Sequence, residues 1–266
     1  MSKNNSEDML LLEQSDHTVE IFYFFDPFSD DCITMEPIIN KLLIEYRGHI
    51  TIKKILAPSL SVLTKCQAQS TSSDDNVALA YKAAEIQGQS KARAFIRYIF
   101  NRINPSNTIC TKEMIDDSAR LAGIDLKSFH EDLHSPSLDA MLKYDLCVFR
   151  EMDIDNLPAM VFFSGDAKSE GVKIDGSYPY HIYTYVINEL VGIEIEKRQL
   201  PSIIDYIRAH ELVSFEELKT IFEWRAGLLL NELKKLRLQR LIDEVSLNNQ
   251  SFYQLKQSSL PLKTKV

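Results

Sequence analysis

Cysteine is scarce in this chain of 266 residues, which contains only four, all far apart. There is no C-x-x-C pair and no cluster that combines cysteine with histidine. His130 and His134 stand one helical turn apart, a spacing that can ligate zinc, but no third ligand accompanies them in the sequence. We therefore expect free and mostly buried thiols, no metal site and no cofactor. The four cysteines are Cys32, Cys66, Cys110 and Cys147.

Long apolar runs are also absent. No stretch approaches the ~18 residues that a membrane-spanning helix needs. The first residues, MSKNNSEDMLLLEQSD, have no basic region ahead of an apolar one, so they do not resemble a secretory signal. We expect a cytoplasmic protein with no membrane partner and with a flexible lead-in over residues 1–17.

Charge is distributed unevenly along the chain. The whole sequence has a net charge of −8, which argues against nucleic acid as its main partner. Residues 197–266 nevertheless contain 12 Lys and Arg against 8 Asp and Glu, a net charge of +4, so the remainder carries −12. The basic tail is therefore expected to be a separate electrostatic unit and a separate domain.

The first part of the chain predicts a β-α-β unit. Thr18–Asp26 is rich in β-branched and aromatic residues and reads as a buried strand. Ser29 is a good N-cap for the helix that follows, which contains Pro37. Ile50–Leu56 alternates again and predicts a second strand, parallel to the first and joined by a right-handed crossover.

The middle of the chain predicts helices, and strands return after it. From about Asp74 to Asp153 the pattern is helical, and strands are then expected at Leu157–Gly165 and Gly171–Tyr180. His181–Val191 predicts a closing amphipathic helix. Local signals place the starts of three of the central helices: Thr111, Ser128 with Glu131 as a capping box, and Ser135 followed by Pro136.

This order of elements resembles the DsbA-like group of thioredoxin-fold proteins. The strand IFYFFD leads into a helix in which Cys32 is followed by Pro37, the C-x4-P spacing of a thioredoxin active-site helix. AAEIQG, LAGIDLKSFHEDL and DIDNLPAMVFF also resemble segments of that group. The resemblance implies an α/β fold, with a thioredoxin-like (DsbA-like) domain at residues 18–195 that carries a large all-helical insertion at about 60–153. It also implies that the Leu157–Pro158 bond is cis and faces the active-site helix.

Three further stretches resemble one family within that group. FFDPFSDDC, LAPSLSVLTKCQAQSTS and DGSYPYHIYTYVINEL are similar to the YjbH/SpxH family, and the resemblance runs from about Val19 to Leu255. Members of that family are adaptors that deliver the stress regulator Spx to the ClpXP protease in Gram-positive bacteria. The resemblance implies a non-enzymatic adaptor in thiol and oxidative stress control, with Spx, ClpX and ClpP as partners. The zinc-binding tail of some members is not expected, because this amino terminus holds only His17 and no cysteine.

Four residues form a degenerate redox motif: Ser29, Asp30, Asp31 and Cys32. A dithiol enzyme needs an attacking thiolate at the first of these positions, and the serine hydroxyl there cannot form a disulfide. Asp30 and Asp31 are expected to raise the pKa of the remaining thiol through their like charge. We expect disulfide exchange to be lost, with a residual thiol-disulfide activity as the alternative.

A protein-binding surface is expected where the redox groove lies in the family. It would combine the degenerate motif with the cis-proline loop, Leu157 and Pro158. The polar segment TKCQAQSTSSDD, in particular Lys65, Cys66 and Gln67, is a candidate partner-contact loop beside it.

The tail predicts a winged-helix-like domain at residues 197–255, followed by a flexible end at 256–266. Three helices are expected, at Ser202–Ala209, from Ser214 to about Phe222, and at Arg225–Leu241, and then a hairpin at Val245–Leu255. The third helix has a leucine stripe and a basic face. That face suggests a DNA-binding regulator, a protein contact or a solvated surface, and its charges are those of Lys234, Lys235, Arg237 and Arg240.

Overall fold

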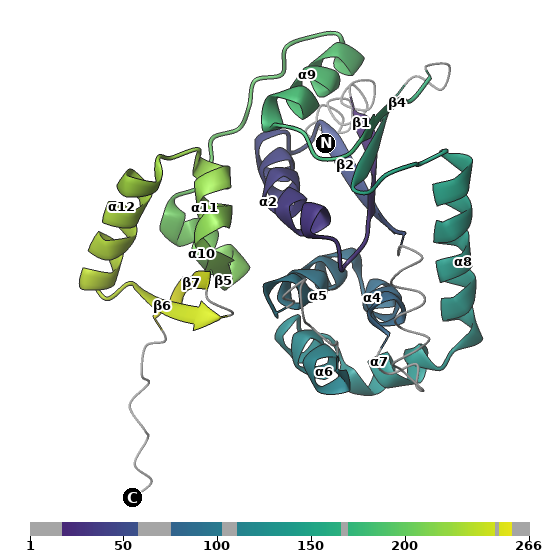
Figure 1. Cartoon of the computed structure of the whole chain (residues 1–266), viewed down its shortest axis with the longest axis horizontal. Helices are drawn as coiled ribbons and strands as arrows, with labels where there is room; N and C mark the ends of the chain where they lie inside the picture. Colours follow the sequence, from purple (N-terminus) through teal and green to yellow (C-terminus); the bar gives the residue numbers. More distant parts are fainter. Residues whose placement is uncertain (1–17, 58–75, 103–110, 166–169, 248–249, 257–266) are drawn as a thin grey trace, which may run out of the picture. The chain divides into compact units, whose positions relative to one another are not determined.

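The computed structural model describes residues 18–57, 76–102, 111–165, 170–247 and 250–256. The chain divides into two compact units, Met1–Gln199 and Leu200–Val266, which are coloured along the sequence in Figure 1. Within the described ranges, none of the helices has the length and apolar character needed to cross a membrane.

The first unit is built on a mixed four-stranded sheet in the order β2-β1-β3-β4. Strand β1 pairs in parallel with β2 and antiparallel with β3, which in turn pairs antiparallel with β4. The parallel pair is connected through α2, as the β-α-β pattern predicted (Figure 1). The bounds are β1 Val19–Phe25, α2 Asp30–Glu45, β2 Ile50–Leu56, β3 Ala159–Ser164 and β4 Val172–Asp175.

Both faces of this sheet are covered. On one face, Ile21 and Tyr23 of β1 belong to the main core together with Met35 of α2 and Tyr183 of α9 (Tyr180–Val191). On the other face, Phe24 packs in a second cluster with Val148 of α8 (Pro136–Glu151). The alternating side chains of β1 therefore hold α2 and α9 against one face and α8 against the other.

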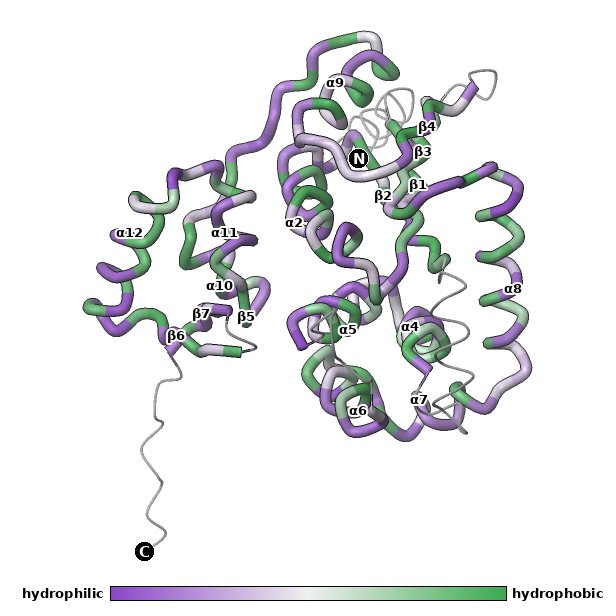
Figure 2. Tube along the Cα trace, viewed as in Figure 1, coloured by the Kyte–Doolittle hydropathy of each residue, from purple (hydrophilic) through white to green (hydrophobic). Residues whose placement is uncertain are grey.

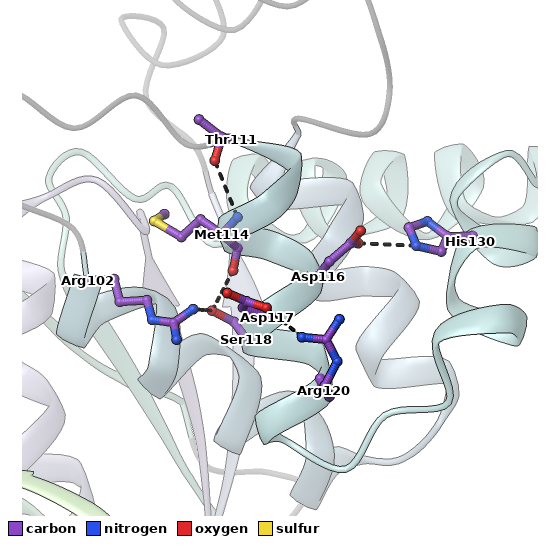
Figure 3. A network of polar contacts seen from close by, with 8 residues as sticks. All are labelled: Arg102, Thr111, Met114, Asp116, Asp117, Ser118, Arg120 and His130. Atoms are coloured by element: carbon purple, nitrogen blue, oxygen red, sulfur yellow. Dashed lines mark hydrogen bonds and ion pairs between the residues drawn. The ribbon is translucent and has the colours of Figure 1, made fainter.

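The described part of the insertion between β2 and β3 contains the helices α4 Val77–Ile86, α5 Gln89–Arg102, α6 Lys112–Leu121, α7 Leu126–Leu133 and α8. Polar contacts between them supplement their apolar packing (Figure 3). The Arg102 guanidinium lies 3.4 Å from the Ser118 hydroxyl and joins α5 to α6. His130 Nε2 lies 3.1 Å from Asp116 Oδ1 and joins α6 to α7.

Local capping signals are confirmed at two of the three predicted helix starts. The Thr111 hydroxyl accepts the Met114 amide at 3.3 Å, and Ser135 caps α8 with Pro136 in the first turn. The capping box at Ser128 was wrong, because α7 begins earlier. The carboxylate of Asp125 is the cap and accepts the amide of Ser128 at 2.9 Å.

A buried ion pair fastens the insertion to the sheet. Lys82 of α4 pairs with Asp145 of α8, and Lys82 also lies 2.5 Å from Glu85. The Asp145 carboxylate accepts the backbone amide of Leu56, at the end of β2, at 3.1 Å. Lys82 is 3% exposed and Asp145 is 4% exposed, so neither charge has water as a substitute partner.

Replacing Asp145 by alanine is expected to lower the free energy of unfolding by about 3 kcal/mol, because it leaves a buried ammonium and a buried amide short of an acceptor. Urea unfolding of the full chain measures this change. The exposed Lys143 of the same helix provides the control, since Lys143→Ala should change stability by less than about 0.5 kcal/mol. Equal effects of the two substitutions would contradict this role of Asp145.

Glu45 of α2 binds the last segment of the first unit through three contacts. Its Oε2 accepts the Tyr180 hydroxyl at 2.6 Å and lies 3.5 Å from the Lys197 ammonium. Its backbone carbonyl accepts the Arg198 amide at 2.8 Å. Ile195 is 5% exposed and belongs to the main core. The chain therefore stays fixed to the first unit as far as Arg198.

Over its described residues, the second unit has three helices and a small sheet in the order β5-β7-β6. The hydroxyl of Tyr206 donates to the buried Glu217 carboxylate at 2.6 Å, and the predicted leucine stripe of α12 is buried. The three helices and the hairpin follow the predicted order, while β5 was not predicted; the winged-helix assignment remains a prediction. The bounds are α10 Ile203–His210, β5 Leu212–Ser214, α11 Phe215–Phe222, α12 Ala226–Leu238, β6 Ile242–Leu247 and β7 Gln250–Leu255.

Candidate functional site

The candidate site lies where β1 ends and α2 begins. Ser29 is the N-cap of α2, and its hydroxyl oxygen accepts the Cys32 amide at 3.4 Å. Asp30 and Asp31 occupy the first turn and are exposed, where their charges complement the positive end of the helix dipole. The serine hydroxyl at the attacking position therefore has a structural partner, and the two carboxylates face solvent.

The Cys32 thiol is part of the core. Its residue is 0% exposed, and its sulfur accepts the backbone amide of Asp26 at 3.4 Å. The hydroxyl of the buried Tyr23 donates to the Cys32 carbonyl at 3.2 Å. These contacts fix the first turn of α2 to the end of β1, and they leave the sulfur without access to a substrate disulfide.

Burial raises the pKa of the Cys32 thiol to about 11. The Asp26 amide and the Ser29 side chain act in the opposite direction, and the charges of Asp26 and Glu36 add to the increase. The expected direction is confirmed, but the expected cause was wrong. The main cause is desolvation, and the negative charges that contribute are those of Asp26 and Glu36, not those of Asp30 and Asp31.

The predicted cis-proline loop lies at the same end of the sheet, where β1 ends and α2 begins; this end is called the edge of the sheet below. The Leu157–Pro158 bond is cis, as the resemblance implied. Ala159 pairs with Phe24, so Pro158 lies one position further along, beside the end of β1. The Pro158 carbonyl accepts the Gly176 amide at 2.7 Å, which ties the loop to the end of β4. The degenerate motif and the cis-proline loop thus share one edge.

The chain leaves β2 at the same end of the strands. The Ala57 amide donates to the Phe25 carbonyl at 2.9 Å, so the last described residue after β2 also lies there. Lys65, Cys66 and Gln67, the predicted contact residues, lie outside the described residues.

An ion pair between β2 and α2, in which the lysine is buried and the glutamate partly buried, was not predicted from the sequence. Lys54 of β2 is 5% exposed, and its ammonium lies 2.7 and 2.8 Å from the two carboxylate oxygens of Glu36 on α2. The same ammonium lies 5.8 Å from the centre of the Phe25 ring. The sequence contained a signal for this pair. A lysine within the apolar strand TIKKIL needs an anionic partner if its side chain points into the core.

This arrangement disfavours thiol-disulfide exchange at Cys32. With a pKa of about 11, roughly one thiol in ten thousand is ionised at pH 7, and only the thiolate attacks a disulfide. Cys147 is exposed, but its hydrogen bond with Glu151 raises its pKa as well. Among the described residues, no group of three His, Cys, Asp or Glu side chains is placed to hold a metal ion.

Sequence comparisons extend over nearly the whole chain. Residues 22–185 match the model of a thioredoxin family. The chain is 49% identical over 263 residues to the "ClpXP adapter protein SpxH" of Staphylococcus aureus strain MRSA252, covering 99% of this chain and 97% of that protein. The protein of the same name from strain USA300 gives the same identity and coverage.

Solved structures with a similar fold are thiol-disulfide proteins. The α-DsbA1 protein of Wolbachia pipientis has a TM-score of 0.53 and 16% identity, over 66% of this chain and 86% of that one. The thiol-disulfide exchange protein α-DsbA2 of the same organism has a TM-score of 0.51 and 16% identity, over 70% and 94%. At these identities the likeness establishes the DsbA-like thioredoxin fold alone.

Thiol labelling tests the burial of Cys32 directly. In a variant that keeps only this cysteine, with Cys66, Cys110 and Cys147 replaced by serine, we expect labelling at pH 7 to be at least about a hundredfold slower than in urea. The native rate should rise about tenfold per pH unit up to about pH 11, because the thiolate is the reactive form, whereas the unfolded rate should level off above its ordinary pKa.

A variant that keeps only Cys147 serves as the control and should label without denaturant, because that residue is exposed. Rapid native labelling of Cys32 that levels off near neutral pH would contradict the buried, protonated thiol.

Proposed function

This chain belongs to the SpxH family of ClpXP adapters, and from that premise we propose that it binds the regulator Spx and promotes its degradation by ClpXP. It does so in the cytoplasm, as part of thiol and oxidative stress control. It acts by binding and catalyses no reaction of its own.

One observation carries the proposal. Identity of 49% extends over 99% of this chain and 97% of the relative, so the match includes both units and not the thioredoxin-like part alone. The site supports it, since among the described residues Ser29 is engaged in a capping hydrogen bond and the Cys32 thiol is buried. The edge of the sheet remains available for non-covalent contacts.

The binding surface that we assign to Spx is the edge that carries the degenerate motif, the cis-proline loop and the segment around Lys65–Gln67. Asp30 and Asp31 are its exposed charges on α2. The thioredoxin-like domain at 18–195 would supply this surface, and the winged-helix-like domain at 197–255 would supply a second one.

Degradation of purified Spx by purified ClpXP, with and without the chain, tests the adaptor function. We expect the chain to shorten the half-life of Spx and to show no insulin-reducing activity above the background. Cys32→Ser should retain the effect with a stability loss of about 1 kcal/mol, because a hydroxyl replaces a thiol in an apolar site. An Spx half-life that is unchanged by the wild-type chain would refute the proposal.

Charge reversal at Asp30 and Asp31 tests the assigned surface. The double substitution Asp30→Lys/Asp31→Lys should weaken Spx binding at least about tenfold in a titration, since it inverts the exposed charge of the edge. Loss of favourable helix-dipole interactions will also lower stability slightly. Glu113→Lys, in the first turn of α6, reproduces that dipole effect elsewhere and should leave Spx binding unchanged. Equal weakening by both variants would place the Spx surface elsewhere.

A further inference from the structure

Helix α12 of the second unit is apolar on more than the side that faces its core. It contains six leucines in the sequence AGLLLNELKKLRL, and Figure 2 shows hydrophobic and hydrophilic stretches alternating along it. Leu229, Leu233 and Leu236 are at most 5% exposed and form the core stripe. The other three leucines face solvent, with exposed fractions of 61% at Leu228, 51% at Leu230 and 76% at Leu238.

The exposed leucines form a pattern together with lysine. Leu230, Lys234 and Leu238 follow one another at intervals of four residues, so they form one row along the helix. Leu241, three residues after Leu238 and beyond the end of the helix, is also exposed, at 42%. A helix that is apolar on several sides is normally covered on several sides. This leucine row (Leu230, Lys234, Leu238 and Leu241) is therefore a surface that is expected to be covered by a partner.

The charge around the leucine row is positive. Lys235 lies 3.4 Å from Glu232, and Arg237 pairs with Glu244. Lys234 and Arg240 form no ion pair with any described residue. A cationic surface with exposed leucines is complementary to a segment that presents apolar side chains and carboxylates.

A hollow of about 320 Å³ lies beside the row and offers a place for an apolar side chain. Leu230, Phe215 and Tyr253 contribute its apolar lining. Its two acidic residues are already paired, Glu216 with Lys219 at 3.0 Å and Glu244 with Arg237. The hollow therefore does not cancel the positive charge of the row.

Two other occupants fit this surface less well. A DNA-reading helix presents polar side chains to base edges and phosphates, and three solvent-facing leucines cannot make such hydrogen bonds. A second copy of this chain would bring Lys234 and Arg240 against identical charges if the two rows met. An acidic partner avoids both problems.

We propose that the leucine row of α12 is a docking surface for an acidic amphipathic segment of a partner protein. The apolar side chains of that segment lie on Leu230 and Leu238 and enter the adjacent hollow, and its carboxylates pair with Lys234 and Arg240. This is the recognition of an amphipathic helix by an apolar groove, with the charge of the rim selecting acidic sequences. The surface belongs to the second unit and does not depend on the assignment of Spx to the first.

The test uses the full chain and a fluorescein-labelled synthetic peptide of about sixteen residues, with leucines at i, i+3, i+4 and i+7 spacing and glutamates elsewhere. A permuted peptide of the same composition, in which the leucines share no helical face, is the ligand control. In fluorescence anisotropy titrations we expect saturable binding of the amphipathic peptide, and binding at least about tenfold weaker for the permuted one.

Substitutions at exposed residues test whether the leucine row is the binding surface, and they leave the core residues unchanged. Leu230→Ser/Leu238→Ser and Lys234→Glu/Arg240→Glu should each weaken peptide binding at least about tenfold, and the second should also remove most of its salt dependence. Leu121→Ser and Lys143→Glu, exposed residues of the insertion, are the matched controls and should bind as the wild type does.

Three results would overturn the proposal. The first is absent binding, or equal binding of both peptides by all variants. The second is tighter binding of a labelled duplex DNA that is lost in Lys234→Glu/Arg240→Glu, which would make α12 a nucleic-acid reader. The third is a wild-type dimer in sedimentation that Leu230→Ser/Leu238→Ser dissociates, which would make the row a self-association surface.

Discussion

Burial of the Cys32 thiol is the constraint on which the chemistry of the thioredoxin-like unit depends. The sulfur lies in the core in contact with the Asp26 amide, and desolvation there raises its pKa to about 11. The hydroxyl of Ser29 is meanwhile occupied as the cap of α2. Ser29 and Cys32 occupy the two positions that hold thiols in a redox-active helix. Here both side chains stabilise the start of α2. The thioredoxin-like fold is retained, while neither of these two side chains is placed for thiol exchange.

Two charge pairs with little solvent exposure connect the elements near the site. Lys54 and Glu36 join β2 to α2, while Lys82 and Asp145 join two insertion helices and contact the end of β2. Breaking either pair would leave a charge in a low-dielectric interior, which makes partial separation of the elements unfavourable. A binding surface on such a scaffold needs little reorganisation when a partner arrives.

The sequence predicted the elements well where the signals were local. The alternation of Val19–Phe25, the Ser29, Thr111 and Ser135 caps and the resemblance that implied the cis bond at Pro158 all depend on neighbouring residues. The sequence did not predict contacts between residues that are far apart along the chain. Lys82 and Asp145 are 63 residues apart, and strand β5 exists through its pairing with β7, so neither has a local pattern. Asp125 is the cap instead of Ser128 because α7 begins at Leu126, so the carboxylate of Asp125 accepts the Ser128 amide of the first turn.

The second unit gives the chain a surface of opposite character. The first unit presents exposed carboxylates at Asp30 and Asp31, whereas α12 presents leucines among basic residues. An adaptor that joins two proteins needs two surfaces that do not compete for one partner, and opposite charge is a simple way to keep them distinct.

The central claim is that this member of the SpxH family works by binding, without thiol chemistry. A cysteine-free chain, with Cys32, Cys66, Cys110 and Cys147 all replaced by serine, tests it most directly when added to purified ClpXP and Spx. The account predicts that Spx disappears at a rate close to that seen with the wild-type chain. Loss of stimulation by a cysteine-free chain that is still folded, as judged by circular dichroism and its unfolding transition, would contradict it.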